Sequence, residues 1–432
     1  KMLKTAVKYR RSQLLNREEQ MKINLTKYRW VILAISCLIN LCIGSIYAWS
    51  VLASPMAEEL RVDDLSIVFS VANAVGFITM IIGGILNDRY GPRWIVFTGG
   101  LMFGSGMLIS GYAKSVFALT AGYGLLLGLG LALVYGCTIS NTIKFFPDRR
   151  GMVGGLTTAA YGISSVLIAP VASALNSMVG VRASFKILGL VFVLVICTGS
   201  FFLKKCPNGF SPEGFQPREC ETEAGAREGA GEDYTPLEML RTPVFYIMLL
   251  FLTCGGVFGM MIISSAYSIG VNMVGLSSAA ASLMVSVLCV FNTTGRLAAG
   301  TLSDKFGRVN TLTAAIVIAV AGLIVLYLAD LQSSFQLFAA GVILVGICFG
   351  TFMGVFPGFT ADRFGVKHNT VNYGIMWIGF SLAGIIGPSI LTKAVAATGN
   401  YRMAFLIALF IAVLGLLTSF AYRGLNRRKP QN

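Results

Sequence analysis

The sequence predicts an all-α membrane protein whose twelve transmembrane helices form two pseudo-symmetric six-helix bundles. Three observations lead to this fold class. Apolar residues make up 55% of the 432 residues and charged residues only 12%, whereas soluble domains carry about 25% charged residues. Twelve apolar stretches follow one another along the chain, and one charged motif occurs in both halves. The composition excludes a soluble enzyme, a disordered chain and a disulfide scaffold.

Each apolar stretch is bounded by charged residues and is long enough to cross about 30 Å of hydrocarbon as a helix. A membrane barrel would instead show alternating segments of about ten residues. The stretches therefore predict one bundle over 30–203 and a second over 243–422. They lie near residues 30–53, 65–87, 94–113, 117–143, 152–179, 183–203, 243–270, 278–302, 309–329, 333–360, 369–397 and 401–422.

Basic residues are distributed unevenly between the two sides of these bundles. With the N-terminus inside, the inner segments hold 27 of the 34 Lys and Arg residues and the outer loops hold six. Because cytoplasmic loops carry an excess of Lys and Arg, we expect 1–29, 204–242 and 423–432 to be cytoplasmic. Membrane topology therefore explains the net charge of +15, and we expect no nucleic-acid partner.

Two hydrophilic segments need a separate interpretation. Residues 1–20 are polar and basic, and Met21 would be an ordinary start for a polytopic protein. We interpret 1–20 as either an appended leader or a short amphipathic surface helix. Residues 204–242 contain Gly, Pro and seven Glu, which predicts a flexible linker between the bundles.

A loop motif occurs twice, as Gly84–Arg93 and as Gly300–Arg308, at an offset of 216 residues. A second pair, Phe146–Gly151 and Asp362–Gly365, repeats at 214. Parallel repeats of six helices are the architecture of major facilitator transporters. An Asp at a helix end can pair with Arg and with helix-terminal N–H groups, so we expect gating contacts here; the alternative is a plain tight turn. The candidate gating residues are Asp88, Arg89, Arg93, Asp148, Arg149, Arg150, Asp304, Lys305 and Arg308.

Arg296 is the charged residue placed away from the ends of a predicted span, and the spans contain no Asp, Glu or His. Such an Arg costs about 2.5–3.5 kcal/mol to insert. Asn292 lies one turn earlier on the same face, and the equivalent residue of the first half is Met80, so the architecture does not require a cation. An unpaired guanidinium in a cavity suits a carboxylate and predicts a small organic anion as substrate. The alternative is an Arg that snorkels to the inner surface, about six residues away.

Aromatic residues are expected around this cation. Tyr hydroxyls can hydrogen-bond carboxylate oxygens, and aromatic walls keep a site small and dry. The alternative for any one of them is helix packing or an interfacial belt. The candidate substrate-binding residues besides Arg296 and Asn292 are Tyr47, Tyr135, Tyr161, Tyr373, Trp377 and Phe380.

Several motifs together resemble the oxalate/formate antiporter family of the major facilitator superfamily, which is related to monocarboxylate transporters. The resemblance covers roughly residues 25–425. The motifs are Gly44-x-x-Tyr47-x-Trp49, Phe145–Gly151, Ala-Ala-Tyr-Gly at 159–162, Met239–Pro243, Asn292-x-x-Gly295-Arg296, Ser303-Asp304-Lys305 and Asn372-Tyr373-Gly374.

The resemblance implies that Arg296 binds a substrate carboxylate and that Tyr47, Tyr135, Tyr161 and Trp377 line the pocket. The dicarboxylate member of the family has a second cation, a Lys, at the position of Phe380. We therefore expect a monocarboxylate such as formate, lactate or pyruvate, with oxalate/formate exchange as the alternative. Monocarboxylate transporters have an acid where this chain has Asn292, which favours antiport or a substrate that carries its own proton.

The remaining expectations concern reaction class and partners. Nine Cys show no CxxC or Cys/His cluster, and no nucleophile–base pair is visible, so we expect no metal, no cofactor and no enzyme activity. The expected partners are the anion and the bilayer, in a monomer of a prokaryotic plasma (inner) membrane. The alternatives are a carboxylate sensor that transports little and a drug exporter, which would normally have an acid in its cavity.

Overall fold

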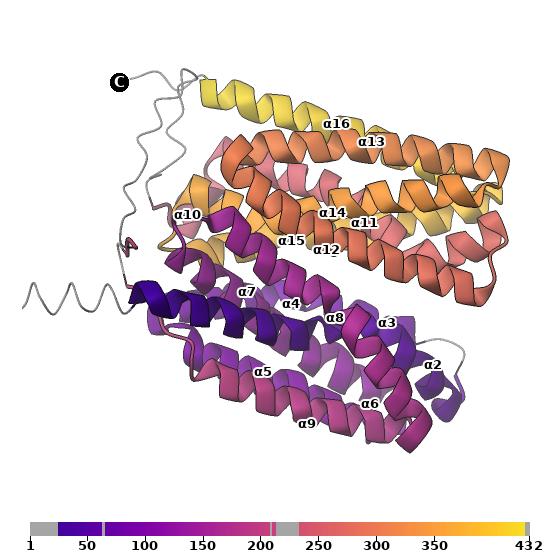
Figure 1. Ribbon diagram of the computed structural model, residues 1–432, viewed down its shortest axis with the longest axis horizontal. Coiled ribbons are helices and arrows are strands. Elements are labelled where there is room, and N and C mark those ends of the chain that lie inside the picture. The colour runs from indigo at the N-terminus through magenta and orange to yellow at the C-terminus, as the bar shows by residue number, and fades with distance from the viewer. Residues whose placement is uncertain (1–24, 63–64, 208–209, 213–232, 428–432) are drawn as a thin grey trace, which may run out of the picture.

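The computed structural model describes residues 25–62, 65–207, 210–212 and 233–427. These residues form helices and no strands, which confirms the all-α prediction. Figure 1 shows two bundles of roughly parallel helices, one from each half of the chain, lying side by side. The proposed leader at 1–20 lies outside the described residues.

The N-terminal bundle begins with a helix over Leu25–Ala48, whose last turn is the 3₁₀ segment η1 (Gly44–Ala48). The predicted first span continues beyond residue 53, because α2 extends it to Leu60. The other helices of this bundle are α2 (Trp49–Leu60), α3 (Ser66–Ala74), α4 (Gly76–Tyr90), α5 (Pro92–Ser110), α6 (Val116–Leu119), the π-helix η2 (Thr120–Leu127), α7 (Gly128–Phe145), α8 (Arg150–Val179) and α9 (Val181–Ser200).

The C-terminal bundle follows a short helix at the end of the predicted linker. Its six long helices match the predicted spans in order, although most extend several residues further at one or both ends. The helices are α10 (Pro236–Leu240), α11 (Pro243–Val274), α12 (Ser278–Phe306), α13 (Arg308–Gln332), α14 (Phe335–Phe364), α15 (Asn369–Thr398) and α16 (Arg402–Arg427).

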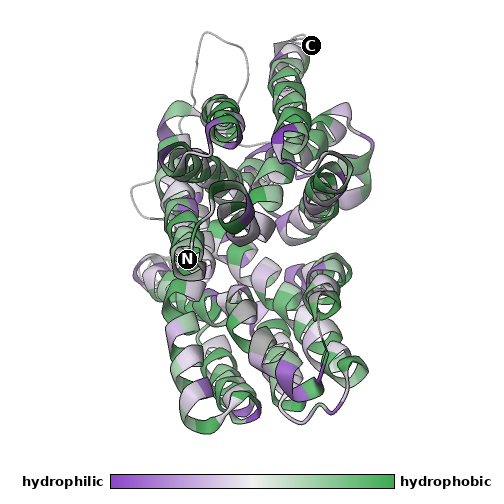
Figure 2. Ribbon diagram, turned by 90° about the vertical axis from the view of Figure 1, so that its right-hand side faces the viewer, coloured by the Kyte–Doolittle hydropathy of each residue, from purple (hydrophilic) through white to green (hydrophobic). Residues whose placement is uncertain are grey.

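Eleven helices in the described part of the chain are long and apolar enough to cross a membrane. The remaining predicted span, 94–113, corresponds to α5, a 19-residue helix that contains Arg93 and four glycines. Figure 2 shows apolar residues on the outer surfaces of both bundles, as contact with lipid requires.

The two bundles meet along two helix pairs, α8 with α12 and α4 with α15. Small residues bring α8 and α12 together, since a Cβ added at Gly155 would lie 2.5 Å from the backbone oxygen of Arg296. This seam passes directly beside the candidate cation. We call the end of the molecule where α4 and α12 end and α8 and α15 begin the linker face, because the chain crosses from one bundle to the other there (Figure 1).

The two described ends of the predicted linker are docked on the linker face. The Lys204 carbonyl accepts a hydrogen bond from Asn141, 3.0 Å away. At the other end, the Tyr234 N–H donates to the Phe364 carbonyl at 3.0 Å, and α10 carries a capping box formed by Thr235 and Glu238. The prediction of a flexible linker over all of 204–242 is therefore wrong for these ends.

Candidate functional site

Arg296 lies deep in α12. The helix continues to Phe306, so ten residues separate Arg296 from the linker face, about 15 Å at helical rise. The predicted span ended too early, at residue 302, because charged Asp304 and Lys305 are still helical. Arg296 is 2% exposed, so its guanidinium does not reach the surface of the protein as the snorkelling alternative would require.

The guanidinium of Arg296 is held by neutral groups. Its Nε donates to Asn292 Oδ1 at 2.8 Å, and its Nη1 donates across the seam to the Thr158 carbonyl at 2.9 Å. Gly162 makes room for it, because a Cβ there would lie 3.3 Å from Nε. Among the described residues Nη2 has no hydrogen-bond partner, and no carboxylate pairs with the side chain. The positive charge is therefore buried, oriented and uncompensated.

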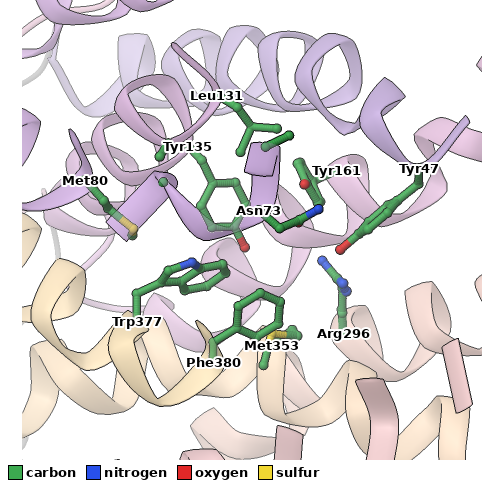
Figure 3. Close-up of a pocket in the computed structure, with 13 residues that line it drawn as sticks. Tyr47, Asn73, Met80, Leu131, Tyr135, Tyr161, Arg296, Met353, Trp377 and Phe380 are labelled. Atoms are coloured by element: carbon green, nitrogen blue, oxygen red, sulfur yellow. The ribbon is translucent and has the colours of Figure 1, made fainter. Parts of the chain in front are cut away.

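Arg296 lines a pocket between the two bundles (Figure 3). The cavity has a volume of about 30 Å³ for the centres of water molecules. One water needs about 10–15 Å³ on this measure, so the space suits two or three waters or one small ligand. The lining residues are Tyr47, Ala72, Asn73, Gly76, Met80, Leu131, Ala132, Tyr135, Tyr161, Arg296, Met353, Trp377 and Phe380.

Five of the six aromatic residues expected at the site line this pocket. The ring of Tyr161 lies 5.1 Å from that of Tyr47 and 5.0 Å from that of Tyr135. Trp377 continues the wall, 5.1 Å from Tyr135 and 4.3 Å from Phe380. Figure 3 shows the hydroxyl of Tyr47 and the guanidinium of Arg296 pointing toward each other from opposite bundles. Most of the wall is therefore apolar, and the tyrosine hydroxyls point into the cavity.

Tyr373 and Asn292 do not line the cavity. Tyr373 is 1% exposed and packs 5.7 Å from Trp377. Asn292 holds Arg296 through its Nε. Both residues lie behind the lining and fix the orientation of residues that do reach the cavity.

Sequence reasoning missed Asn73. Asn73 lies two residues before Val75, where α3 ends and α4 begins, and its Nδ2 donates to the Phe69 carbonyl at 2.9 Å. A polar side chain inside an apolar span is a signal that could have identified it. Met80, Leu131 and Met353 were also missed, because apolar residues in a span give no sign of facing a cavity.

On the linker face, one network of charges joins the two halves. Asp304 accepts hydrogen bonds from the backbone N–H groups of Gly151 and Met152, both at 2.8 Å. It also pairs with Arg308 at 2.7 Å. Since Gly151 and Met152 open α8, an acid of the C-terminal half binds a helix N-terminus of the other half.

Asp362 extends this network. It accepts from Arg150 of the N-terminal half at 2.7 Å and from Arg308 at 2.8 Å. Arg308 is 7% exposed, so its guanidinium is buried between the carboxylates of Asp304 and Asp362. The network ties α8, α12 and α14 together at the linker face.

The first copy of the motif makes a different set of contacts. Asp88 pairs with Lys144, 2.7 Å away, and accepts from the Thr370 hydroxyl of the other half at 2.9 Å. Thr370 also accepts from Asn87 at 2.8 Å. A cation from α7 thus takes the place that the sequence suggested for an Arg.

The other candidate gating residues fall into two groups. Asp148 pairs with Arg29 of its own half, 2.7 Å away, and lies 3.7 Å from Arg149. Arg89, Arg93, Arg149 and Lys305 are exposed at the linker face. Within the described ranges, no group of three His, Cys, Asp or Glu side chains is placed to hold a metal ion.

The chain was compared with known proteins. A family model described as Major Facilitator Superfamily matches residues 33–388 and 261–432. The oxalate:formate antiporter of Oxalobacter formigenes is 28% identical over 88% of each chain. Monocarboxylate transporter 11 of Mus musculus is 27% identical over 93% of this chain and 88% of its own.

Among solved structures, the transporter FucP in the outward conformation has a TM-score of 0.71 at 14% identity, covering 91% of this chain and 99% of FucP. This likeness shows the fold. The two sequence relatives confirm the resemblance that the motifs indicated.

Proposed function

The chain belongs to the Major Facilitator Superfamily, and from that premise we propose that it is a secondary active transporter of small carboxylates. One observation carries the proposal: Arg296 holds a buried positive charge at the pocket between the bundles, with Nη2 unpaired and no carboxylate beside it. A buried charge without a counter-ion is costly. A bound anion would remove that cost.

Monocarboxylates are the substrates we favour. The pocket contains one cation, and Phe380 stands where a second cation would be needed to neutralise a dianion. The cavity is small, which favours a small anion. The names of the two relatives, an oxalate:formate antiporter and a monocarboxylate transporter, agree with this substrate class, and formate, lactate and pyruvate are the first candidates.

Transport would proceed by alternating access, with the two bundles rocking around the fixed site. In the described arrangement the linker face is held shut by contacts of Asp304, Arg150 and Thr370 across the two halves. These contacts must break for the pocket to open on that side. We infer that the linker face is cytoplasmic, in a prokaryotic plasma membrane, and that the monomer is the working unit.

Antiport and uptake of the substrate with its own proton are both compatible with this site. Among the described residues no acid pairs with Arg296, and the residue one turn earlier is the neutral Asn292. Exchange of unequal charges would respond to the membrane potential, at about 2.3 kcal/mol per charge per 100 mV.

The test uses purified protein in liposomes and a radiolabelled monocarboxylate. We expect uptake by the wild-type chain and a loss of about a hundredfold in Arg296→Gln, because charge-assisted hydrogen bonds contribute about 1.5–3 kcal/mol. The matched control is Lys393→Gln, which neutralises an exposed cation far from the pocket. If Arg296→Gln takes up the anion as fast as the wild type and the control is also active, Arg296 does not bind the substrate and the proposed anion site is wrong.

A further inference from the structure

We propose that Asn73 is a specificity-determining residue that hydrogen-bonds an oxygen substituent of the substrate, so that the pocket prefers 2-hydroxy monocarboxylates to unsubstituted ones. This inference rests on the proposed function, since it names the substrate class for the same site. No motif pointed to Asn73; its position in the pocket does.

The polar groups of the pocket come from two sides. Arg296 supplies the cation from the C-terminal bundle, and Asn73 supplies an amide from the N-terminal bundle. Figure 3 shows both side chains pointing into the same cavity from opposite halves. A ligand whose carboxylate lies on Arg296 therefore presents its far end toward the N-terminal bundle.

The amide of Asn73 is oriented by its own helix. Its Nδ2 donates one hydrogen to the Phe69 carbonyl at 2.9 Å. This bond leaves Oδ1 as an acceptor and the second amide hydrogen as a donor. A hydroxyl group can use either one.

Apart from the hydroxyls of Tyr47, Tyr135 and Tyr161, the wall that Asn73 belongs to is apolar. Met80, Leu131 and Ala132 offer apolar surface on the N-terminal side, and Met353 and Phe380 do so on the other. A buried hydroxyl that loses water without gaining a partner is disfavoured. Asn73 offers such a partner to a substituent that lies among these apolar side chains.

The repeat shows that the fold does not require this amide. Asn73 corresponds to Cys289 at the offset of 216 residues, and Cys289 is not part of the pocket lining. The cation has entered one half and the amide the other, which makes the site polar at two separated points. That pattern matches a small molecule that carries both a carboxylate and a hydroxyl group.

The test compares glycolate with propionate, which have nearly the same shape and differ by a hydroxyl in place of a methyl group. In thermal-shift titrations of the wild-type protein, we expect glycolate to bind about tenfold more tightly, as one net hydrogen bond allows. Equal binding of the two anions, or tighter binding of propionate, would overturn the inference.

Transport measurements in liposomes then test whether Asn73 is the residue responsible for the preference for glycolate. We expect Asn73→Leu to lower the glycolate-to-propionate rate ratio about tenfold, and Thr79→Val to leave that ratio as in the wild type. Thr79 lies in the same span with its hydroxyl bonded to the Leu129 carbonyl, outside the pocket lining. A ratio unchanged in Asn73→Leu would contradict the role of Asn73, as would an equal fall of both rates, which would mean that the amide contacts the carboxylate itself.

Failure of the proposed function gives a different result. If the wild-type chain binds and carries neither anion, the carboxylate site itself is wrong. If it carries both and Arg296→Gln abolishes both, the anion site stands, whatever Asn73 does. A variant of Asn73 that does not fold leaves the wild-type titration as a sufficient test.

Discussion

The two halves of the molecule share a fold and differ at the positions that could bind a substrate. At the offset of 216 residues, Arg296 corresponds to Met80, and both side chains line the pocket. The residue one turn earlier is Asn292 in the second half and Gly76 in the first. Arg296 and Asn292, the side chain that orients it, therefore occur together in one half. This indicates that the two residues act as a pair. The six-helix bundle itself does not need them, because the other half folds without them.

The two halves also differ at the linker face, in the surroundings of an Arg residue of the repeated motif. Arg308, in the second copy of the motif, is buried between Asp304 and Asp362. Arg93, in the first copy, is exposed, and Lys144 from another helix pairs with Asp88 instead. Two nearly identical sequence motifs thus place their cations in different environments. Sequence identity between the two copies therefore does not imply that corresponding residues have the same role.

The largest effect that tests this difference is on stability. We expect Arg308→Ala to lower the free energy of unfolding by about 3 kcal/mol, because it removes charge-assisted hydrogen bonds, worth about 1.5–3 kcal/mol, between a buried guanidinium and the carboxylates of Asp304 and Asp362. The exposed counterpart, Arg93→Ala, should change it by less than about 0.5 kcal/mol. Melting temperatures of the two purified variants in the same detergent give the comparison. Equal losses would mean that the two copies work alike.

The next effect is on transport, in a variant that exchanges the two equivalent residues, Met80→Arg with Arg296→Met. Uptake should stay about tenfold to a hundredfold below wild type, because Gly76 cannot hold a guanidinium as Asn292 does, and charge-assisted bonds of about 1.5–3 kcal/mol are lost. Liposome uptake of a labelled monocarboxylate measures it, beside Thr79→Val as a control for protein quality. Recovery of wild-type uptake would show that only the charge matters and that its cradle does not.

The smallest effect concerns where each half meets the linker. The N-terminal bundle holds Cys206, which is buried, whereas the C-terminal bundle holds the exposed cap residue Glu238. Burial raises the pKa of the Cys206 thiol to about 12. We expect slow maleimide labelling of Cys206 at pH 7.5, located by mass spectrometry, and an increase in rate as the pH rises toward 12. Because the folded pKa is the raised one, the protonated thiol contributes stability that is fully present below the unfolded pKa of about 8.5 and is lost as the pH rises from there through about 12. Labelling as fast as in unfolded protein would mean that this end of the linker is not docked.

Much of this architecture could be predicted from sequence because hydropathy and charge determine where a chain can cross lipid. The spans, the repeat and the buried position of Arg296 follow from those two properties. The sequence could not reveal that the Thr158 carbonyl would hold Arg296, since a backbone group leaves no mark in a pattern of side chains. Nor could it separate Tyr373, which packs behind the pocket, from Tyr135, which lines it, because both are tyrosines on apolar helices.

Helix ends were the least predictable part of the fold. Asp304 was expected to lie in a loop beyond residue 302, yet it lies within α12 and reaches the first turn of α8. Its position depends on a partner helix about 150 residues away in the chain, which local composition does not encode.

The glycines of α5 have a consequence for the packing of the N-terminal bundle. Gly104 lets α9 approach so closely that a Cβ there would lie 2.8 Å from the Gly189 carbonyl, and at Gly99 a Cβ would lie 3.1 Å from the Gly130 carbonyl of α7. Any larger side chain at these two positions would separate α5 from its neighbours. The bundle opposite the cation therefore depends on residues that have no side chain at all.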